Sequence, residues 1–234
     1  MLDRFSRKIR RQESPCYARL YRIAKFIRGF EIPVIPLLYT FLYRERQARL
    51  VLWRTLTRVL YFTPLLKTRC QSVGKRLHLT GGIPLIVGSL RLVIGDDVTL
   101  FGYSTLSGAK VFDAPTLTIG NNTTLGYQLV INVGSDVTIG ANCLIAERVI
   151  IMSYDGHPTN PAERNLPAPK ESSRPITIGD NVWIGANATI LKGVTIGDGS
   201  VVASGSVVTM KVPPNCLAIG NPARCYPLMI GVTP

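Results

Sequence analysis

The chain has 234 residues, 46% of them hydrophobic and 18% charged, which is enough apolar sequence to bury a core and excludes intrinsic disorder. Its five cysteines form no CxxC pair and no Cys/His cluster, so neither a disulfide framework nor a metal site is expected, and a reduced, cytosolic setting fits best. The net charge of +13 is concentrated in residues 1–78, which hold 18 Lys and Arg against 4 Asp and Glu. Such an excess is typical of proteins that bind a membrane surface or nucleic acid.

Residues 1–78 are predicted to form a basic, amphipathic, α-helical segment. Ser14 followed by Pro15 is typical of a helix start, and this helix is expected to end near Gly29. A second helix is predicted over about 44–61. In both helices apolar side chains share one face while arginines occupy most of the rest. This pattern suits an in-plane membrane anchor, because apolar burial adds to the attraction of anionic lipid.

Other interpretations of these helices stay open. Their apolar stripes would also suit packing on the C-terminal domain or between subunits, whereas no RNA- or DNA-binding motif supports nucleic acid as a partner. The first 12 residues are too charged for a signal peptide, and the longest apolar run, 30–43, is shorter than the roughly 20 residues of a spanning helix. We therefore expect a cytoplasmic protein peripherally associated with the inner face of the cell membrane.

Residues 79–234 are predicted to form a separate, mainly β domain. Starting at Ile94, an aliphatic residue recurs every six positions within each uninterrupted stretch, often followed by glycine. The series is Ile94, Leu100, Leu106, Ile119, Leu125, Ile131, Ile139, Ile145, Ile151, Ile178, Ile184, Ile190, Ile196, Val202 and Val208. A period of six predicts a parallel β-helix in which three hexapeptides make one triangular coil, so this series makes five coils.

The six-residue period is interrupted at three places. The spacing is seven residues too long between Leu106 and Ile119 and two too long between Ile131 and Ile139. It is 21 residues too long between Ile151 and Ile178, in the stretch that contains His157. Long loops on rigid scaffolds often carry function, so a protruding functional loop is predicted there.

Four stretches of this domain resemble the hexapeptide-repeat acyltransferases, in particular the maltose and galactoside O-acetyltransferase group. They read "GHPTNPAERN", "PITIGDNVWIGANATILKGVTIGDGSVVASGSVVT", "VPPN" and "IGNPAR". The resemblance covers about residues 90–227. It implies a left-handed parallel β-helix, here of about five to six coils, that assembles as a homotrimer with active sites between subunits. It also implies acyl transfer from acetyl-CoA to a hydroxyl group.

The resemblance assigns the general base to His157. A sugar hydroxyl becomes a good nucleophile when a base removes its proton, and imidazole, with a free pKa of about 6.5, suits that task. The other histidine, His78, is expected to be a solvent-side strand residue, and Cys143 a residue of a coil. A carboxylate is needed to orient the imidazole. The family pattern favours Glu171, while Asp155, where the family commonly has a small or hydroxyl residue, is an equal physical candidate.

The resemblance also implies a set of CoA contacts. Trp183 would lie beside the pantetheine channel, the backbone at Ala203 and Ser204 would line the CoA site, and Arg224 would lie near the CoA phosphates. Lys211 is a further candidate, but "TMKVP" places it one position away from the lysine of the family's "TKDVP". On a strand this displacement would move its side chain to the other face.

Together these features predict a homotrimeric, membrane-associated O-acetyltransferase. Its acceptor is expected to be a lipid-linked or membrane-proximal saccharide of surface polysaccharide or lipopolysaccharide synthesis, contacted by Asn132, Tyr154 and Arg164. Two alternatives stay open: an N-acetyltransferase of an amino sugar, and a non-catalytic trimeric β-helix that serves as a scaffold at the membrane.

Overall fold

The computed structural model describes residues 2–228, with side chains from residue 5, and the chain divides into two units, residues 1–51 and 52–234. The first unit holds α1 (Leu2–Arg11), α2 (Pro15–Gly29) and the start of α3 (Pro36–Thr57). The Ser14 hydroxyl accepts a hydrogen bond from the backbone N–H of Tyr17 at 3.3 Å, so it caps α2. The predicted limits of this helix are therefore confirmed.

The second predicted helix is longer than the expected 44–61. It begins with α3 at Pro36, since a proline in the first turn has no N–H that the helix needs, and continues through the π-helical turn η1 (Arg58–Phe62) into α4 (Thr63–Arg69). α4 is fixed to the β domain. Leu66 is buried in its core, and the Arg69 guanidinium donates to the carbonyl oxygens of Gly88 at 2.9 Å and Leu90 at 3.0 Å.

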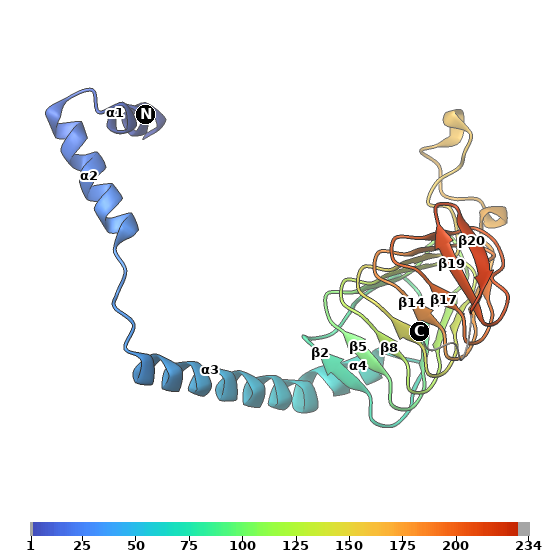
Figure 1. Cartoon of the computed structure of the whole chain (residues 1–234). Coiled ribbons are helices and arrows are strands. Elements are labelled where there is room, and N and C mark those ends of the chain that lie inside the picture. The colour runs from blue at the N-terminus through green and yellow to red at the C-terminus, as the bar shows by residue number, and fades with distance from the viewer. Residues whose placement is uncertain (1, 229–234) are drawn as a thin grey trace. The chain divides into compact units, whose positions relative to one another are not determined.

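The rest of the second unit is a parallel β-solenoid of about seven turns (Figure 1), which confirms the mainly β prediction. Successive strands up to residue 208 pass to three sheets in rotation, and the last two strands, within residues 216–227, form an antiparallel pair at the end of sheet B. Sheet A contains β1 (Ser72–Val73), β4 (Arg91–Ile94), β7 (Thr116–Ile119), β10 (Val137–Ile139), β13 (Ile176–Ile178) and β16 (Thr195–Ile196). Sheet B contains β2 (His78–Thr80), β5 (Thr99–Phe101), β8 (Thr124–Leu125), β11 (Leu144–Ile145), β14 (Trp183–Ile184), β17 (Val201–Val202), β19 (Cys216–Gly220) and β20 (Ala223–Pro227). Sheet C contains β3 (Leu85–Val87), β6 (Thr105–Gly108), β9 (Val130–Val133), β12 (Ile150–Met152), β15 (Thr189–Leu191) and β18 (Val207–Val208).

The core is built from in-register ladders of the predicted aliphatic residues. In sheet A the ladder consists of isoleucines, each paired with its equivalent one coil away: Ile94, Ile119, Ile139, Ile178 and Ile196. All five are buried. The expected five to six coils are fewer than the seven observed, because the first coil, from Ser72 to Val87, and the last strands do not keep the strict six-residue spacing.

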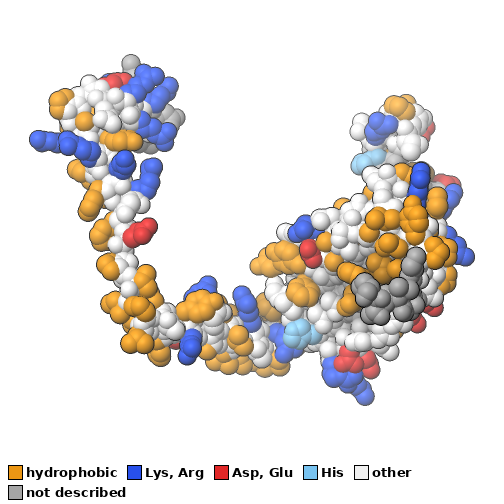
Figure 2. Space-filling view, viewed as in Figure 1, with side chains coloured by type: hydrophobic (Ala, Val, Ile, Leu, Met, Phe, Trp, Pro, Cys, Tyr) orange, Lys and Arg blue, Asp and Glu red, His pale blue; other side chains and the backbone are white. Residues whose placement is uncertain are grey.

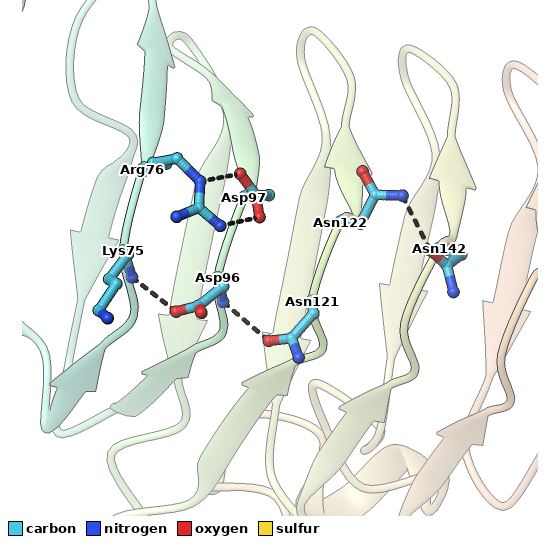
Figure 3. A network of polar contacts seen from close by, with 7 residues as sticks. All are labelled: Lys75, Arg76, Asp96, Asp97, Asn121, Asn122 and Asn142. Carbon is cyan, nitrogen blue, oxygen red and sulfur yellow. Dashed lines mark hydrogen bonds and ion pairs between the residues drawn. The ribbon is translucent and has the colours of Figure 1, made fainter.

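Polar side chains link the coils at the corner between sheets A and B (Figure 3). Asp96 accepts a hydrogen bond from the backbone N–H of Lys75 at 2.6 Å, and Asn121 accepts one from Asp96 at 2.8 Å. Asn122 and Asn142 adopt positive φ angles of 53° and 57°, which asparagine tolerates better than most residues, and their side chains are hydrogen-bonded at 2.8 Å. The corner residues thus satisfy backbone donors that the strands leave free.

All three predicted interruptions lie where sheet C passes to sheet A, which we call the C–A corner. The longest, residues 153–175, is the protruding loop drawn in gold in Figure 1 and contains η2 (Pro161–Glu163) and η3 (Lys170–Ser172). Its base is held by the buried Ser153, whose hydroxyl accepts from the N–H of Gly134 at 2.8 Å and whose carbonyl accepts from the N–H of Arg174 at 2.9 Å. A rigid support for a protruding loop is therefore present.

Candidate active site

The C–A corner collects the predicted catalytic and acceptor-binding residues. Five of them belong to the protruding loop: Tyr154, Asp155, His157, Arg164 and Glu171. The sixth, Asn132, lies in β9 beside Met152 of β12, the strand from which the loop leaves. Because neighbouring coils are in register, residues that are distant in sequence share one edge of the solenoid.

His157 is an exposed residue of the protruding loop. Glu171 is exposed in η3, at the far end of the same loop. Among the described residues, no hydrogen bond or ion pair joins the imidazole to Glu171 or to Asp155. Arg164 is turned toward the loop itself, since its guanidinium donates to the carbonyl oxygen of Thr159 at 3.0 Å. The imidazole is thus available to an incoming hydroxyl group.

Asp155 is engaged with a residue that the sequence interpretation missed. Its carboxylate forms an ion pair with the ammonium group of Lys192, which follows β15 on the next coil. Its backbone N–H donates to the carbonyl oxygen of Ser172 at 3.3 Å. The only feature of the sequence that could have indicated a role for Lys192 is that it is a charged residue directly after β15, the sheet C strand of the coil that follows the loop.

A cavity of about 290 Å³ opens at the base of the loop. Its lining is a strip of sheet C together with the start and end of the loop: Met152, Tyr154, Asp155, Arg174, Leu191, Lys192 and Thr209. Tyr154 packs edge-on against Phe112, with ring centroids 5.7 Å apart, and occupies the space over Gly134. A Cβ at Gly134 would lie 2.6 Å from the Tyr154 Cβ, so glycine is needed there. Arg174 and Thr209 were also missed from sequence.

Most of the predicted CoA contacts lie elsewhere on the solenoid. Trp183 points outward from sheet B with 54% of its surface exposed, beside a second cavity of about 340 Å³. Aromatic and aliphatic side chains line much of this cavity, including Phe101, Tyr127 and Leu144. An apolar groove of this kind fits the pantetheine arm that the resemblance implies, since such sites are mostly apolar with few polar groups.

Small residues shape the corner between sheets B and C next to Trp183. Ala203 and Ser204 lie there, and a Cβ at Gly185 would come within 2.6 Å of the Ser204 nitrogen. Arg224 is exposed in β20, and Lys211 is exposed just before the bridge that Val212 makes with Ile196. Neither basic side chain makes a hydrogen bond or ion pair with another residue in the described range 2–228.

One chain does not bring the two groups of predicted residues together. In a three-sided solenoid the C–A corner lies across from sheet B, so His157 and Trp183 are on opposite sides of the same chain. Lys211 is the exception among the CoA candidates, because it follows β18 of sheet C and lies at the C–A corner. A site that needs both groups requires a second chain.

Two other residues considered from sequence are placed away from any site. His78 is exposed in β2 on the first coil. Cys143 is fully buried between coils, its thiol donates to the Gly179 carbonyl at 3.1 Å, and burial raises the pKa of that thiol. A buried cysteine with a raised pKa does not act as a nucleophile, which agrees with its predicted place in a coil.

Known proteins similar to this chain decide the family. The family model described as the hexapeptide repeat of succinyl-transferase matches residues 175–210. A Dictyostelium discoideum protein named as an acetyltransferase is 43% identical to this chain over 138 residues. The matched residues cover 55% of this chain and 70% of that protein. The chain belongs to the hexapeptide-repeat acetyltransferases. Its identification from sequence as a member of this group, and the prediction of an acyltransferase, are therefore confirmed.

Similarity to a galactoside acetyltransferase is found both in sequence and among solved structures. The galactoside O-acetyltransferase of Escherichia coli (strain K12) is 47% identical over 106 residues, which cover 45% of this chain and 51% of that protein. The solved structure of a galactoside acetyltransferase in complex with coenzyme A superposes with a TM-score of 0.50 at 31% identity and covers 71% of this chain and 69% of that one. This chain therefore spans about half the length of the Escherichia coli relative.

Proposed function

We propose that this hexapeptide-repeat acetyltransferase transfers an acetyl group from acetyl-CoA to a hydroxyl group of a saccharide, with His157 as the general base. The observation that carries the proposal is an exposed imidazole that has no hydrogen-bond or ion-pair partner within residues 2–228, on a loop whose base borders a cavity lined by both polar and apolar side chains. No covalent intermediate is needed. His157 takes the hydroxyl proton as the oxygen attacks the thioester carbonyl, the C–S bond breaks, and the imidazolium returns the proton to the departing thiolate.

The donor is proposed to lie along sheet B. Trp183 and the small residues Ala203 and Ser204 would contact its pantetheine arm, and Arg224, which has no hydrogen-bond or ion-pair partner within residues 2–228, would bind its phosphates. Because Lys211 lies at the C–A corner, it could join this contact only from the neighbouring subunit. Glu171 and Asp155 both remain candidates to orient His157. The pairing of Asp155 with Lys192 favours Glu171, because a carboxylate already bound to an ammonium group is less available to an imidazole.

A homotrimer is proposed because His157 and Trp183 lie on opposite sides of one chain. The loop of one subunit would then meet sheet B of its neighbour and complete a site that neither subunit holds alone. Sheet B and its corner with sheet C also present exposed apolar side chains to such a neighbour: Tyr103, Tyr127, Leu144 and Trp183. Closed rotational symmetry would give every subunit the same pair of contacts.

A peripheral location at the cytoplasmic face of the cell membrane is proposed from the N-terminal segment, residues 1–78. Phe26, Ile27 and Phe30 of the α2 region are each more than 60% exposed, and both hydrophobic and basic side chains lie on the surface of the helices (Figure 2). None of the helices in the described range 2–228 is long and apolar enough to span a bilayer. An acceptor at the membrane, such as a lipid-linked saccharide of surface-glycan synthesis, would explain why the positive charge is concentrated there.

The base assignment is tested by acetyl transfer in the full chain. His157→Ala is expected to lower kcat by roughly 10²- to 10⁴-fold, the usual contribution of a general base, while His78→Ala, an exposed histidine on the first coil, keeps wild-type turnover. Products are followed as acetylated saccharide by mass spectrometry. Turnover that survives His157→Ala unchanged would contradict the base assignment. Mild alkali removes O-acetyl but not N-acetyl groups, so the same products separate the two reactions.

The membrane assignment is tested by sedimentation with vesicles that contain anionic phosphatidylglycerol. The triple substitution Ile23→Ser, Phe26→Ser and Ile27→Ser, all at exposed positions of α2, is expected to release the full chain into the supernatant. The control, Leu85→Ser, changes an exposed apolar residue of the solenoid and should leave sedimentation intact. Equal sedimentation of the α2 variant and the control would refute the anchor.

A further inference from the structure

The cavity at the base of the loop carries more positive than negative charge. Lys192 and Arg174 line it together with a single carboxylate, Asp155. The ion pair between Asp155 and Lys192 accounts for one of these positive charges. The guanidinium of Arg174 has no hydrogen-bond or ion-pair partner among residues 2–228. One cation therefore remains free to bind an anion at the edge of the proposed acceptor site.

Arg174 is held in place although its charge is free. Its backbone N–H donates to the carbonyl oxygen of the buried Ser153 at 2.9 Å, which fixes its position at the end of the loop. Its side-chain carbons cover Gly193, where a Cβ would lie 3.3 Å from the Arg174 Cδ. Gly193 has a φ of 78°, which favours glycine and keeps this space open for the arginine stem. An arginine whose aliphatic side chain is supported and whose planar guanidinium group is unpaired suits bidentate recognition of a carboxylate or phosphate.

The same cavity offers a place for the sugar ring itself. Tyr154 lines it together with the two cations, and its ring packs edge-on against the ring of Phe112. Asn132 adjoins the cavity wall through its register with Met152 and holds a hydrogen bond with Ser107 at 2.6 Å. Aromatic faces contact the apolar side of a sugar, while amide and hydroxyl groups select its orientation.

We infer that the acceptor saccharide carries an anionic group, a carboxylate or a phosphate, and that Arg174, assisted by Lys192, binds this group while Tyr154 contacts the ring. The inference rests on the proposed function, since it describes the acceptor of that reaction. Asp155 then has a positioning role: its ion pair holds Lys192 at the cavity and leaves the Arg174 charge uncompensated until the acceptor binds.

The test compares matched acceptors with the full-length wild-type chain and two variants. Uronic acid and sialic acid glycosides are each paired with their methyl esters, and hexose 1-phosphates with the free hexoses. The first variant is Arg174→Gln. The control is Arg91→Gln, which removes an exposed arginine from β4 on the second coil. The readouts are kcat/KM for acetyl transfer and, without acetyl-CoA, the Kd of each acceptor by titration calorimetry.

Wild type and Arg91→Gln are expected to prefer at least one acid over its neutral partner by roughly ten- to hundredfold, the usual range for a charge-assisted contact. Arg174→Gln should reduce this preference to near unity, mainly through the KM of the acceptor. The carboxylate and phosphate arms then distinguish the two sources of charge. An equal preference in Arg174→Gln, no preference in wild type, or a change only in the KM of acetyl-CoA would overturn the inference. Acid-selective binding that Arg174→Gln abolishes, without acetyl transfer to any acceptor, would instead contradict the proposed function while supporting the anion site at Arg174.

Discussion

The isoleucine ladder of sheet A allows a quantitative prediction about what holds the solenoid together. Ile139 in β10 is 1% exposed and stacks in register on Ile119 and Ile178, one coil away on each side. Ile139→Ala removes three carbon atoms, which costs about 2.4 kcal/mol at about 0.8 kcal/mol per buried CH₂. A residual cavity of about 75 Å³ adds about 1.8 kcal/mol at about 24 cal/mol per Å³. The free energy of unfolding should therefore fall by about 4 kcal/mol.

The neighbouring residue in the same strand is the matched control. Thr138 is exposed on the outer face of β10, so Thr138→Ala is expected to change the free energy of unfolding by no more than about 0.5 kcal/mol. Both variants are measured by urea unfolding of the full chain, followed by far-ultraviolet circular dichroism at one protein concentration. A loss below about 1 kcal/mol for Ile139→Ala, or equal losses in the two variants, would refute a core built from these ladders.

Three further predictions concern single positions. Burial raises the pKa of the Cys70 thiol to about 11. Iodoacetamide at pH 8 should therefore alkylate the exposed Cys16 and leave Cys70 unmodified in the folded chain, measured by peptide mass spectrometry. Alkylation of both cysteines at the same rate would contradict this prediction. The hydrogen-bonded ion pair with Arg76 (Figure 3) lowers the pKa of Asp97. The ion pair therefore stabilises the fold above the unfolded-state pKa of Asp97, and this stabilisation is lost as the pH falls through the lower folded-state pKa. Asp97→Asn should therefore lower Tm at pH 7 and lose this effect at strongly acid pH, and a Tm difference independent of pH would exclude the linkage. Gly120→Ala should reduce the soluble yield and Tm, because the added Cβ would lie 2.5 Å from a backbone carbonyl carbon of the next coil. A melting curve equal to that of the wild type would contradict this prediction, since it would show that the backbone at this corner can move apart.

The period of six was sufficient to predict the core because each inward residue of a parallel solenoid contacts its equivalents one coil away. Position along the chain therefore determines the neighbour in space, and Ile94 to Val208 appear in the observed ladders as predicted. The first coil was not counted among the regular coils, and its start lay outside the predicted β domain, because Ser72 to Val87 does not keep this spacing. Its place is secured by α4, whose Leu66 enters the core, and helix packing of this kind leaves no trace in a strand periodicity.

The residues of the proposed site were predictable to different degrees. His157 could be singled out because it lies in the longest interruption of the repeat and matches a family motif. The structure places it on the protruding loop. The pairing of Asp155 with Lys192 was not predictable, because it joins residues 37 positions apart across a loop of arbitrary length. The free charge of Arg174 was equally hidden, since it depends on which neighbours the loop supplies.

The position of every interruption has one physical cause. Within the sheets each strand is bonded to the coils on both sides, so an extra residue there would shift the register and turn an inward side chain outward. Insertions are tolerated at corners, and here the seven-, two- and 21-residue excesses all occur at the C–A corner. Because the coils are parallel, these insertions lie next to one another: Phe112 packs on Tyr154, and the hydroxyl groups of Ser135 and Ser173 are hydrogen-bonded. A change in one insertion therefore alters the surroundings of the next, and acceptor specificity can vary at this corner while the ladders of the core stay intact.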